Sequence, residues 1–450
     1  MKEKARSAVS EVLQAACYIS LYRRVLEKEP VQLMLRLMEV CSSSQPEQKE
    51  AVLLYHRLFS HLAAHAEFQP RRLVGDPWQN YLLNQIICDE NPFTLKAETA
   101  PVGKLSPGLK YAAARDLKYL QVLFQLDNVR LLEIMAALFP AAMPQDWPRW
   151  DQLSRGPREG NHNVDGEETR LKAAMAVCDD WSSLVDDLAS YHYRHGAGIF
   201  SLYRAFRWQR VGRGGQLCGI AHPDPVRLEE LVGIEHNLKI LQENTEFFLE
   251  GLPANNVLLY GDRGTGKSSS IKALLHRYAS RGLRLVEVAR DHLADFPAIV
   301  ERLRDRNLKF IIFVDDLSFQ ETTDQYRFLK AVLEGSVEAR PANVLIYATS
   351  NRRHLVRENW PADTDRRPDD SREELLSLAD RFGITLIFTT PDQATYLQIV
   401  EKLAQLRRLQ VDRDILRREA LIWAQKYNGF SGRTARQFVD YATAIYGRKE

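Results

Sequence analysis

The arrangement of apolar and polar positions divides the chain into two parts with different periodicities. Before about residue 215, apolar residues recur at i, i+3 and i+4, as Leu120, Leu123 and Phe124 do, which is the spacing of one face of an α-helix. The later part alternates helical patterns with short continuous apolar runs at 256–260, 283–288, 310–314, 343–348 and 384–388. Such runs are typical of strands buried on both faces. The pattern predicts an α/β core with a five-stranded parallel sheet behind an all-α N-terminal domain.

Glycine and proline residues mark the junction between these parts. Gly212, Gly214 and Gly215 are followed by Pro223 and Pro225, and clusters of this kind are typical of linkers. We therefore place the domain boundary near 215–225. The N-terminal domain then covers 1–215, and the α/β core begins at 216.

Composition and charge exclude several classes of protein. The 450 residues include 45% hydrophobic and 27% charged residues, close to the averages for globular proteins. The net charge of +2 argues against a polybasic coat for nucleic acid or anionic lipid. No apolar stretch reaches the length of about 20 residues that a membrane-spanning helix requires, and the N-terminal apolar run is too short for a signal peptide. We expect a cytoplasmic protein that does not contact a membrane.

Cysteine and histidine residues give no sign of a metal centre. The cysteines are scattered and odd in number, at Cys17, Cys41, Cys88, Cys178 and Cys218. This favours free thiols in a reducing compartment over a disulfide framework or a zinc site. His192 and His195 are close in sequence but have no Cys or Glu beside them, and we expect both at the surface.

A glycine-rich segment after the first apolar run carries the strongest chemical signal. It reads Gly261, Asp262, Arg263, Gly264, Thr265, Gly266, Lys267, Ser268, and it fits the phosphate-loop pattern G-x-x-x-x-G-K-[ST] in full. A strand precedes it and a helix beginning with Ser269 follows it, as the pattern requires. Backbone N–H groups of the loop would surround phosphate oxygens, Lys267 would reach the β- and γ-phosphates, and the Ser268 hydroxyl would bind Mg²⁺.

Polar residues at the ends of two later strands complete a hydrolytic arrangement. Asp315 and Asp316 directly follow the run 310–314, and Asn351 follows the run 343–348. At the end of a neighbouring strand Asp315 would hold Mg²⁺, and Asp316 would act on the attacking water as a general base. Asn351 would orient that water or contact the γ-phosphate, because ligands of open α/β sheets gather at this edge; an ordinary turn residue is the other interpretation.

Together these motifs resemble the AAA+ class of ATPases. The segment Asp380–Arg381–Phe382–Gly383 is similar to the box whose arginine contacts the nucleotide of a neighbouring subunit, which assigns that role to Arg381. The resemblance also implies that Val232 and Gly233 line the adenine pocket. Asp316 replaces the glutamate that is usual in the class, a mild departure because replication initiators also carry paired aspartates.

The end of the chain extends this resemblance to a helical lid over 391–450, which leaves 216–390 for the core. The segment from Gly429 to Arg436 looks like the sensor-2 segment of such a lid. Arg433 matches the sensor arginine better, and Arg436 is the reserve. The resemblance implies ATP and Mg²⁺ as cofactors and a homo-oligomer in which Arg381 acts in trans.

A closer resemblance is to a bacterial family catalogued as domain of unknown function 815, described as an AAA+-like ATP-binding protein. It is carried by the segments 254–256, 315–319 and 348–354, and it extends from about residue 200 to 440. The family carries no cellular role, and the N-terminal domain matches no fold that we can name.

Two functions are compatible with these features. The first is an ATPase that couples hydrolysis to remodelling of a protein or nucleoprotein partner held by the N-terminal domain; the base-reading N-K-x-D and T-K-x-D motifs of GTPases are absent. The alternative is a nucleotide-dependent binding switch or loader with little turnover, associated with nucleic acid. The side chain of Asp316, shorter than glutamate, favours the switch. A basic insertion would support nucleic-acid or subunit contact, although a solvated loop is the favoured interpretation of it: Arg352, Arg353, His354, Arg357, Arg366, Arg367, Arg372.

Overall fold

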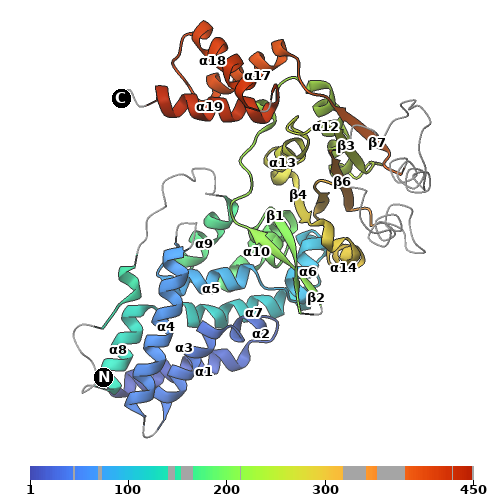
Figure 1. Cartoon of the computed structure of the whole chain (residues 1–450). Coiled ribbons are helices and arrows are strands. Elements are labelled where there is room, and N and C mark those ends of the chain that lie inside the picture. The colour runs from blue at the N-terminus through green and yellow to red at the C-terminus, as the bar shows by residue number, and fades with distance from the viewer. Residues whose placement is uncertain are drawn as a thin grey trace. The chain divides into compact units, whose positions relative to one another are not determined.

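The computed structural model divides the chain into two compact units, Met1–Leu202 and Tyr203–Glu450 (Figure 1). It describes residues 1–43, 46–68, 73–139, 147–153, 166–212, 214–317, 341–351, 381–427 and 429–447. The division lies earlier than the boundary that the glycine cluster suggests, because that cluster is the turn of a β-hairpin in the second unit.

All regular elements in the described part of the first unit are helical. The α-helices are α1 (Lys2–Tyr18), α2 (Arg23–Leu26), α3 (Glu29–Ser42), α4 (Gln48–Phe68), α5 (Pro77–Ile87), α6 (Pro92–Thr99), α7 (Pro107–Phe124), α8 (Asn128–Leu138), α9 (Glu167–Val177), α10 (Val185–His195) and α11 (Ile199–Leu202). Short 3₁₀ helices are η1 (Val102–Lys104), η2 (Trp150–Gln152) and η3 (Trp181–Leu184). Helix α5 shows how the sequence sets a boundary: Asp76 caps it in a capping box, and Pro77 occupies the first turn, where no N–H is needed.

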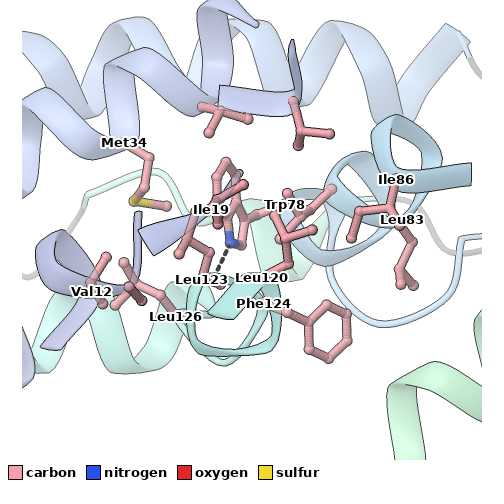
Figure 2. Close-up of a cluster of buried hydrophobic side chains, with 14 of the residues drawn as sticks. Val12, Ile19, Met34, Trp78, Leu83, Ile86, Leu120, Leu123, Phe124 and Leu126 are labelled. Carbon is pink, nitrogen blue, oxygen red and sulfur yellow. Dashed lines mark hydrogen bonds between the residues drawn. The ribbon is translucent and has the colours of Figure 1, made fainter. Parts of the chain in front are cut away.

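Trp78 of α5 lies inside the core of this unit (Figure 2). Its ring is fully buried, and its Nε1–H donates to the carbonyl of Leu123 over 3.0 Å. Leu120 and Leu123, which carry the helical spacing in the sequence, are fully buried beside it. The i, i+3 pattern therefore reports one continuous hydrophobic core rather than an exposed apolar groove along α7.

His192 is fully buried, so the expectation that it lies at the surface is wrong. Its Nδ1 hydrogen-bonds the carbonyl of Gly196 over 3.1 Å at the C-terminal end of α10. Burial lowers the pKa of the imidazole to about 4. His195 is half-buried and pairs with Glu167 at 2.9 Å. The helical face of His192 packs inward, and no motif in the sequence marks that face.

The second unit is built on a mixed seven-stranded sheet of order β2-β1-β4-β5-β6-β3-β7. Its strands are β1 (Ala205–Val211), β2 (Gly214–Ile220), β3 (Val257–Gly261), β4 (Leu283–Val288), β5 (Lys309–Val314), β6 (Val344–Ser350) and β7 (Ile384–Phe388). The five runs identified in the sequence are β3 to β7, and all pair in parallel. The predicted count of five is too low because the hairpin β1–β2 extends the sheet, with β1 parallel to β4.

Some helices of the second unit pack against this sheet, and the last three, here called the lid, pack with one another. They are α12 (Glu235–Leu249), α13 (Lys267–Tyr278), α14 (Phe296–Leu303), α17 (Gln393–Leu406), α18 (Arg413–Lys426) and α19 (Gly432–Tyr446), with 3₁₀ helices η4 (Leu228–Glu230), η5 (Ala279–Arg281) and η6 (Arg290–Asp295). Alternate side chains of β3, β5 and β6 share one core cluster with α12 and α13. Helices α17 to α19 form a separate cluster of their own, the lid (Figure 1).

Asn256, from the family-like segment before the phosphate loop, has a structural place in this sheet. Its Oδ1 accepts from the N–H of Ile346 over 2.9 Å, and its carbonyl accepts from the N–H of Ile384 over 3.2 Å. It thereby joins the start of β3 to β6 and β7. Among the residues that the structure describes, no helix is long and apolar enough to cross a membrane.

We expect the buried His192 to make the stability of the chain fall on acidification. The unfolded imidazole titrates near its ordinary value of 6.5, whereas the folded one titrates near 4. Between these two values the unfolded state binds more protons than the folded state. The free energy of unfolding therefore decreases as the pH falls through that window. Between pH 7 and 5 the loss from this group is on the order of 2 kcal/mol.

The measurement is urea unfolding at both pH values for the wild type and His192→Asn, whose amide can replace the Nδ1 donor but cannot ionise. The variant should lose less stability on acidification than the wild type. His222→Asn, at an exposed position, is the control. Equal pH dependence in all three proteins would contradict the assignment.

Candidate functional site

The glycine-rich segment forms a phosphate loop between β3 and α13. Gly261 and Gly266 have φ values of 132° and 98°, in the region that favours glycine. A Cβ on Gly261 would lie 2.0 Å from the carbonyl oxygen of Phe388. The loop backbone is thus pressed against the end of β7, where only glycine fits.

Lys267, the first residue of α13, is buried at the base of this loop. Its Nζ donates to the carbonyls of Gly261 and Asp262, at 3.0 and 2.5 Å. Burial lowers the pKa of the ammonium to about 8, against the opposing effect of the carboxylates of Asp262, Asp315 and Asp316. The loop backbone therefore holds the ammonium in a position to meet a phosphate.

Asp315 is held by two hydroxyl groups from different elements. The Ser268 Oγ and the Thr349 Oγ1 each donate to Asp315 Oδ1 over 2.6 Å. Strand β6 separates β3 from β5. The phosphate loop and the paired aspartates therefore do not follow neighbouring strands, and the expectation that they do is wrong. The end of β6 instead lies between them and bridges them through Thr349.

The same oxygens fit a magnesium ion. Mg²⁺ prefers oxygen ligands, and it commonly takes one or two protein groups while retaining water and phosphate oxygens. Ser268 and Asp315 offer a hydroxyl and a carboxylate beside the phosphate loop. Across the described ranges no group of three or more His, Cys, Asp or Glu could hold a metal by itself, so phosphate oxygens would have to complete the coordination.

Asp316 and Asn351 lie beside this pair in a fixed arrangement. Asp316 has a φ of 53°, a conformation rare for residues other than glycine. Its N–H donates to Thr349 Oγ1 over 2.9 Å, and Asn351 Nδ2 donates to its Oδ1 over 2.6 Å. The Asp316 carboxylate is thereby held by Asn351, while the Asp315 carboxylate is held by Ser268 and Thr349.

These residues line one side of a cleft with a volume of about 790 Å³. The segment 231–234 forms another part of the wall: Leu231 and Ile234 pack with the sheet cluster, whereas Val232 packs with the lid cluster. Ile399 and Leu403 of α17 add apolar lid surface. The cleft is polar at the phosphate loop and apolar between core and lid, as a nucleotide with a flat base requires.

The lid contacts the phosphate loop directly. The Arg433 N–H donates to the carbonyl of Gly264 over 3.2 Å, and Ser431, the N-cap of α19, lies against the same glycine. Asp262 Oδ2 accepts from the N–H and hydroxyl of Thr390, in the segment that leads from β7 to the lid. The loop therefore contacts the lid helix α19 at Gly264 and the segment that precedes the lid at Asp262.

Arg381 lies away from this cleft, at the opposite end of β7. It precedes Ile384, the first residue of the strand, whereas Phe388 at the other end pairs with Gly261. Arg381 is half-buried, and the adjacent Phe382 is buried. The basic insertion and the start of this box, 352–380, lie outside the described residues.

Comparison with protein families gives one match. The model of a family described as "Protein of unknown function (DUF815)" matches residues 201–446, more than half of the chain. The chain belongs to the DUF815 family. The matched part contains the phosphate loop, the seven-stranded sheet and helices α12 to α19 of the described chain.

Solved structures similar to this DUF815 protein include the RuvB Holliday junction branch migration motor of Thermotoga maritima. The match has 15% sequence identity, covers 49% of this chain and 72% of that chain, and has a TM-score of 0.32. A variant of the same motor matches with 17% identity over the same shares of both chains and a TM-score of 0.31. The search of curated proteins finds no match.

The structure brings most of the expected site residues together and adds others. Residues 263–269, Val232, Gly233, both aspartates, Asn351 and Arg433 all line the cleft. Thr349, Thr390 and Glu230 were not expected. Thr349 stands two positions before Asn351 at the strand end, a detectable signal, whereas Thr390 and Glu230 acquire their partners only through tertiary contacts.

We expect Thr349→Val to damage the site while preserving the strand. The substitution removes the hydroxyl that donates to Asp315 and accepts from the Asp316 N–H, leaving both without this partner. ATP turnover should fall about 10- to 100-fold, the cost of one to two charge-assisted hydrogen bonds. Thr349→Ser keeps the hydroxyl and should retain most activity; equal rates for the two variants in a phosphate-release assay would contradict the bridging role.

Proposed function

We propose that this DUF815 protein is an AAA+-type ATPase that binds ATP with Mg²⁺ and hydrolyses the bond between the β- and γ-phosphates. The observation that carries the proposal is the hydrogen bond between Ser268 and Asp315 beside Lys267. It joins the phosphate loop to the acidic strand end at the distance that one shared cation requires. ATP is the expected nucleotide, since the apolar space between the segment 231–234 and the lid suits adenine.

In this proposal the chain's own residues position phosphate, water and base. Lys267 and the loop N–H groups, from Gly261 to Ser269, hold the phosphates, and Ser268 with Asp315 holds Mg²⁺, which would neutralise charge on the β- and γ-oxygens. Asp316 accepts a proton as a water oxygen forms a bond to the γ-phosphorus and the bond to the β–γ bridging oxygen breaks. The products are ADP and inorganic phosphate. Asn351, bonded to Asp316, orients that carboxylate and the water.

Two arginines from different places would stabilise the charge that develops on the phosphate. Arg433 stands at the first turn of the lid helix over the phosphate loop. Arg381 precedes β7 at the end of the strand that is remote from its own cleft. In a homo-oligomer it would reach the cleft of the next subunit. Such contacts between unlike surfaces build rings or filaments. The helical first unit would hold the protein or nucleoprotein partner, in the cytoplasm.

One observation favours a second function, a nucleotide-dependent binding switch or loader with little turnover that acts on nucleic acid. The Asp316 carboxylate, shorter than glutamate by one methylene, already accepts a hydrogen bond from Asn351 at 2.6 Å. A carboxylate oxygen engaged in this way is less available to accept a hydrogen bond from an attacking water. The two functions differ in the rate of multiple turnover and agree on ATP binding.

Lys267→Ala and Asp316→Asn should separate binding from hydrolysis. Loss of the buried ammonium should abolish ATP binding, measured with a fluorescent ATP analogue. Asp316→Asn should retain binding and lose about 10²- to 10⁴-fold in turnover, the usual contribution of a general base. A wild type that binds ATP but releases no phosphate beyond one equivalent would support the switch instead.

Arg381→Ala should lower turnover without weakening ATP binding, and the wild-type rate per subunit should fall on dilution. A trans arginine is worth roughly 10³- to 10⁵-fold in rate, and it acts only while subunits are associated. The measurement is phosphate release against protein concentration, with sedimentation at the same concentrations. A rate that stays constant well below the micromolar range and survives the substitution would contradict the trans role.

A further inference from the structure

Glu230 and Arg436 form an ion pair at the wall of the cleft, between the core and the lid. Arg436 Nη2 lies 2.9 Å from Glu230 Oε2, and the two side chains are 36% and 25% exposed. Both residues line the cleft. Neither the phosphate chemistry nor the trans arginine uses this pair, so it needs an explanation of its own.

Glu230 is anchored to the core before it meets the lid. Its other oxygen, Oε1, accepts from the Arg227 N–H over 3.1 Å, in a capping box around η4. Leu228 of the same turn is buried in the sheet cluster. The carboxylate is therefore held in place by the α/β core, and it loses little conformational freedom when it binds a partner.

Arg436 lies one helical turn after Arg433 on α19, so the two arginines share one side of that helix. The start of α19 is held by the phosphate loop through the Gly264 carbonyl. Because α19 packs with α17 and α18 in the lid cluster, a single contact with the loop would allow the three helices to turn together about that point. A second point one turn later, at Glu230, fixes the direction of the helix as well as its position.

We propose that the Glu230–Arg436 pair is a positioning device, here called the lid clasp, which sets α19 at the angle that places the Arg433 guanidinium over the phosphates. This rests on the proposed function, and it assigns Arg436 to orienting the lid rather than to binding phosphate. Glu230 also directly precedes the segment 231–234, whose side chains divide between the core and lid clusters. The clasp thus closes the same side of the cleft that would receive the base.

The test compares Glu230→Gln and Arg436→Met, alone and together, in the full-length chain. Glu230→Gln keeps an oxygen for the Arg227 N–H but loses the charge, and Arg436→Met keeps side-chain length without charge. Each should lower kcat by roughly tenfold with KM for ATP changed less than about twofold, because Arg433 is displaced mainly from the transition state. The double variant should be no worse than either single one, since both remove one shared contact. Arg436→Lys should restore most of kcat.

Hydrogen exchange of the α19 amides provides a readout that needs no hydrolysis. Exchange should be faster in Glu230→Gln and Arg436→Met to the same extent. Arg413→Gln is the matched control: it removes an Arg–Glu pair inside the lid, with Glu401 at 2.8 Å, and should leave both kcat and α19 exchange unchanged.

Three results would overturn the lid clasp. They are additive losses in the double variant, unchanged α19 exchange in both single variants, or a raised KM in Arg436→Met with none in Glu230→Gln. The last would make Arg436 a direct phosphate ligand. A fourth result is no turnover in the wild type together with faster α19 exchange in Glu230→Gln and Arg436→Met. That result would support the clasp and overturn the proposed ATPase activity, so the two failures are distinguishable.

Discussion

The site depends on the hydrogen bonds that the Asp315 carboxylate accepts from the hydroxyls of Ser268 and Thr349. They join the helix after the phosphate loop to the ends of β5 and β6. One oxygen of this carboxylate thus accepts from two hydroxyls that come from different elements. The contact brings the phosphate loop and the acidic strand end together at one edge of the sheet.

The order of the strands places the end of β6 beside this contact. Because β6 runs between β3 and β5, its carboxyl end lies between the phosphate loop and the two aspartates. Thr349 bonds both aspartates from there, and Asn351 bonds Asp316. The left-handed backbone at Asp316 then turns the second carboxylate toward Asn351. Strain of this kind persists only where surrounding contacts hold it, and it commonly marks a functional position.

The lid is attached to the same loop, which links nucleotide binding to the position of α19. The phosphate loop meets the lid through Gly264 and the segment before the lid through Asp262, and the core meets the lid again through Glu230. A nucleotide that binds in the cleft would therefore contact both the core and the lid. This arrangement gives a physical route by which phosphate chemistry could alter the lid, whichever partner the helical first unit holds.

The sequence alone predicted the residues of the candidate site because those residues lie in local patterns. The loop from Gly261 to Ser268 requires consecutive residues. Asp315 directly follows an apolar run with Asp316 beside it, and Asn351 stands three positions after the end of the next run, so strand ends and their polar residues could be read in order. The five parallel strands and the helical first part followed from periodicity in the same way. Tertiary structure decided what depends on residues distant along the chain: the addition of the β1–β2 hairpin to the sheet, the interior position of His192, the bridge through Thr349, and the pairing of Glu230 with Arg436. Each of these features depends on how distant parts of the chain pack together. Hydrophobic periodicity carries no information about which polar side chains will meet across a fold.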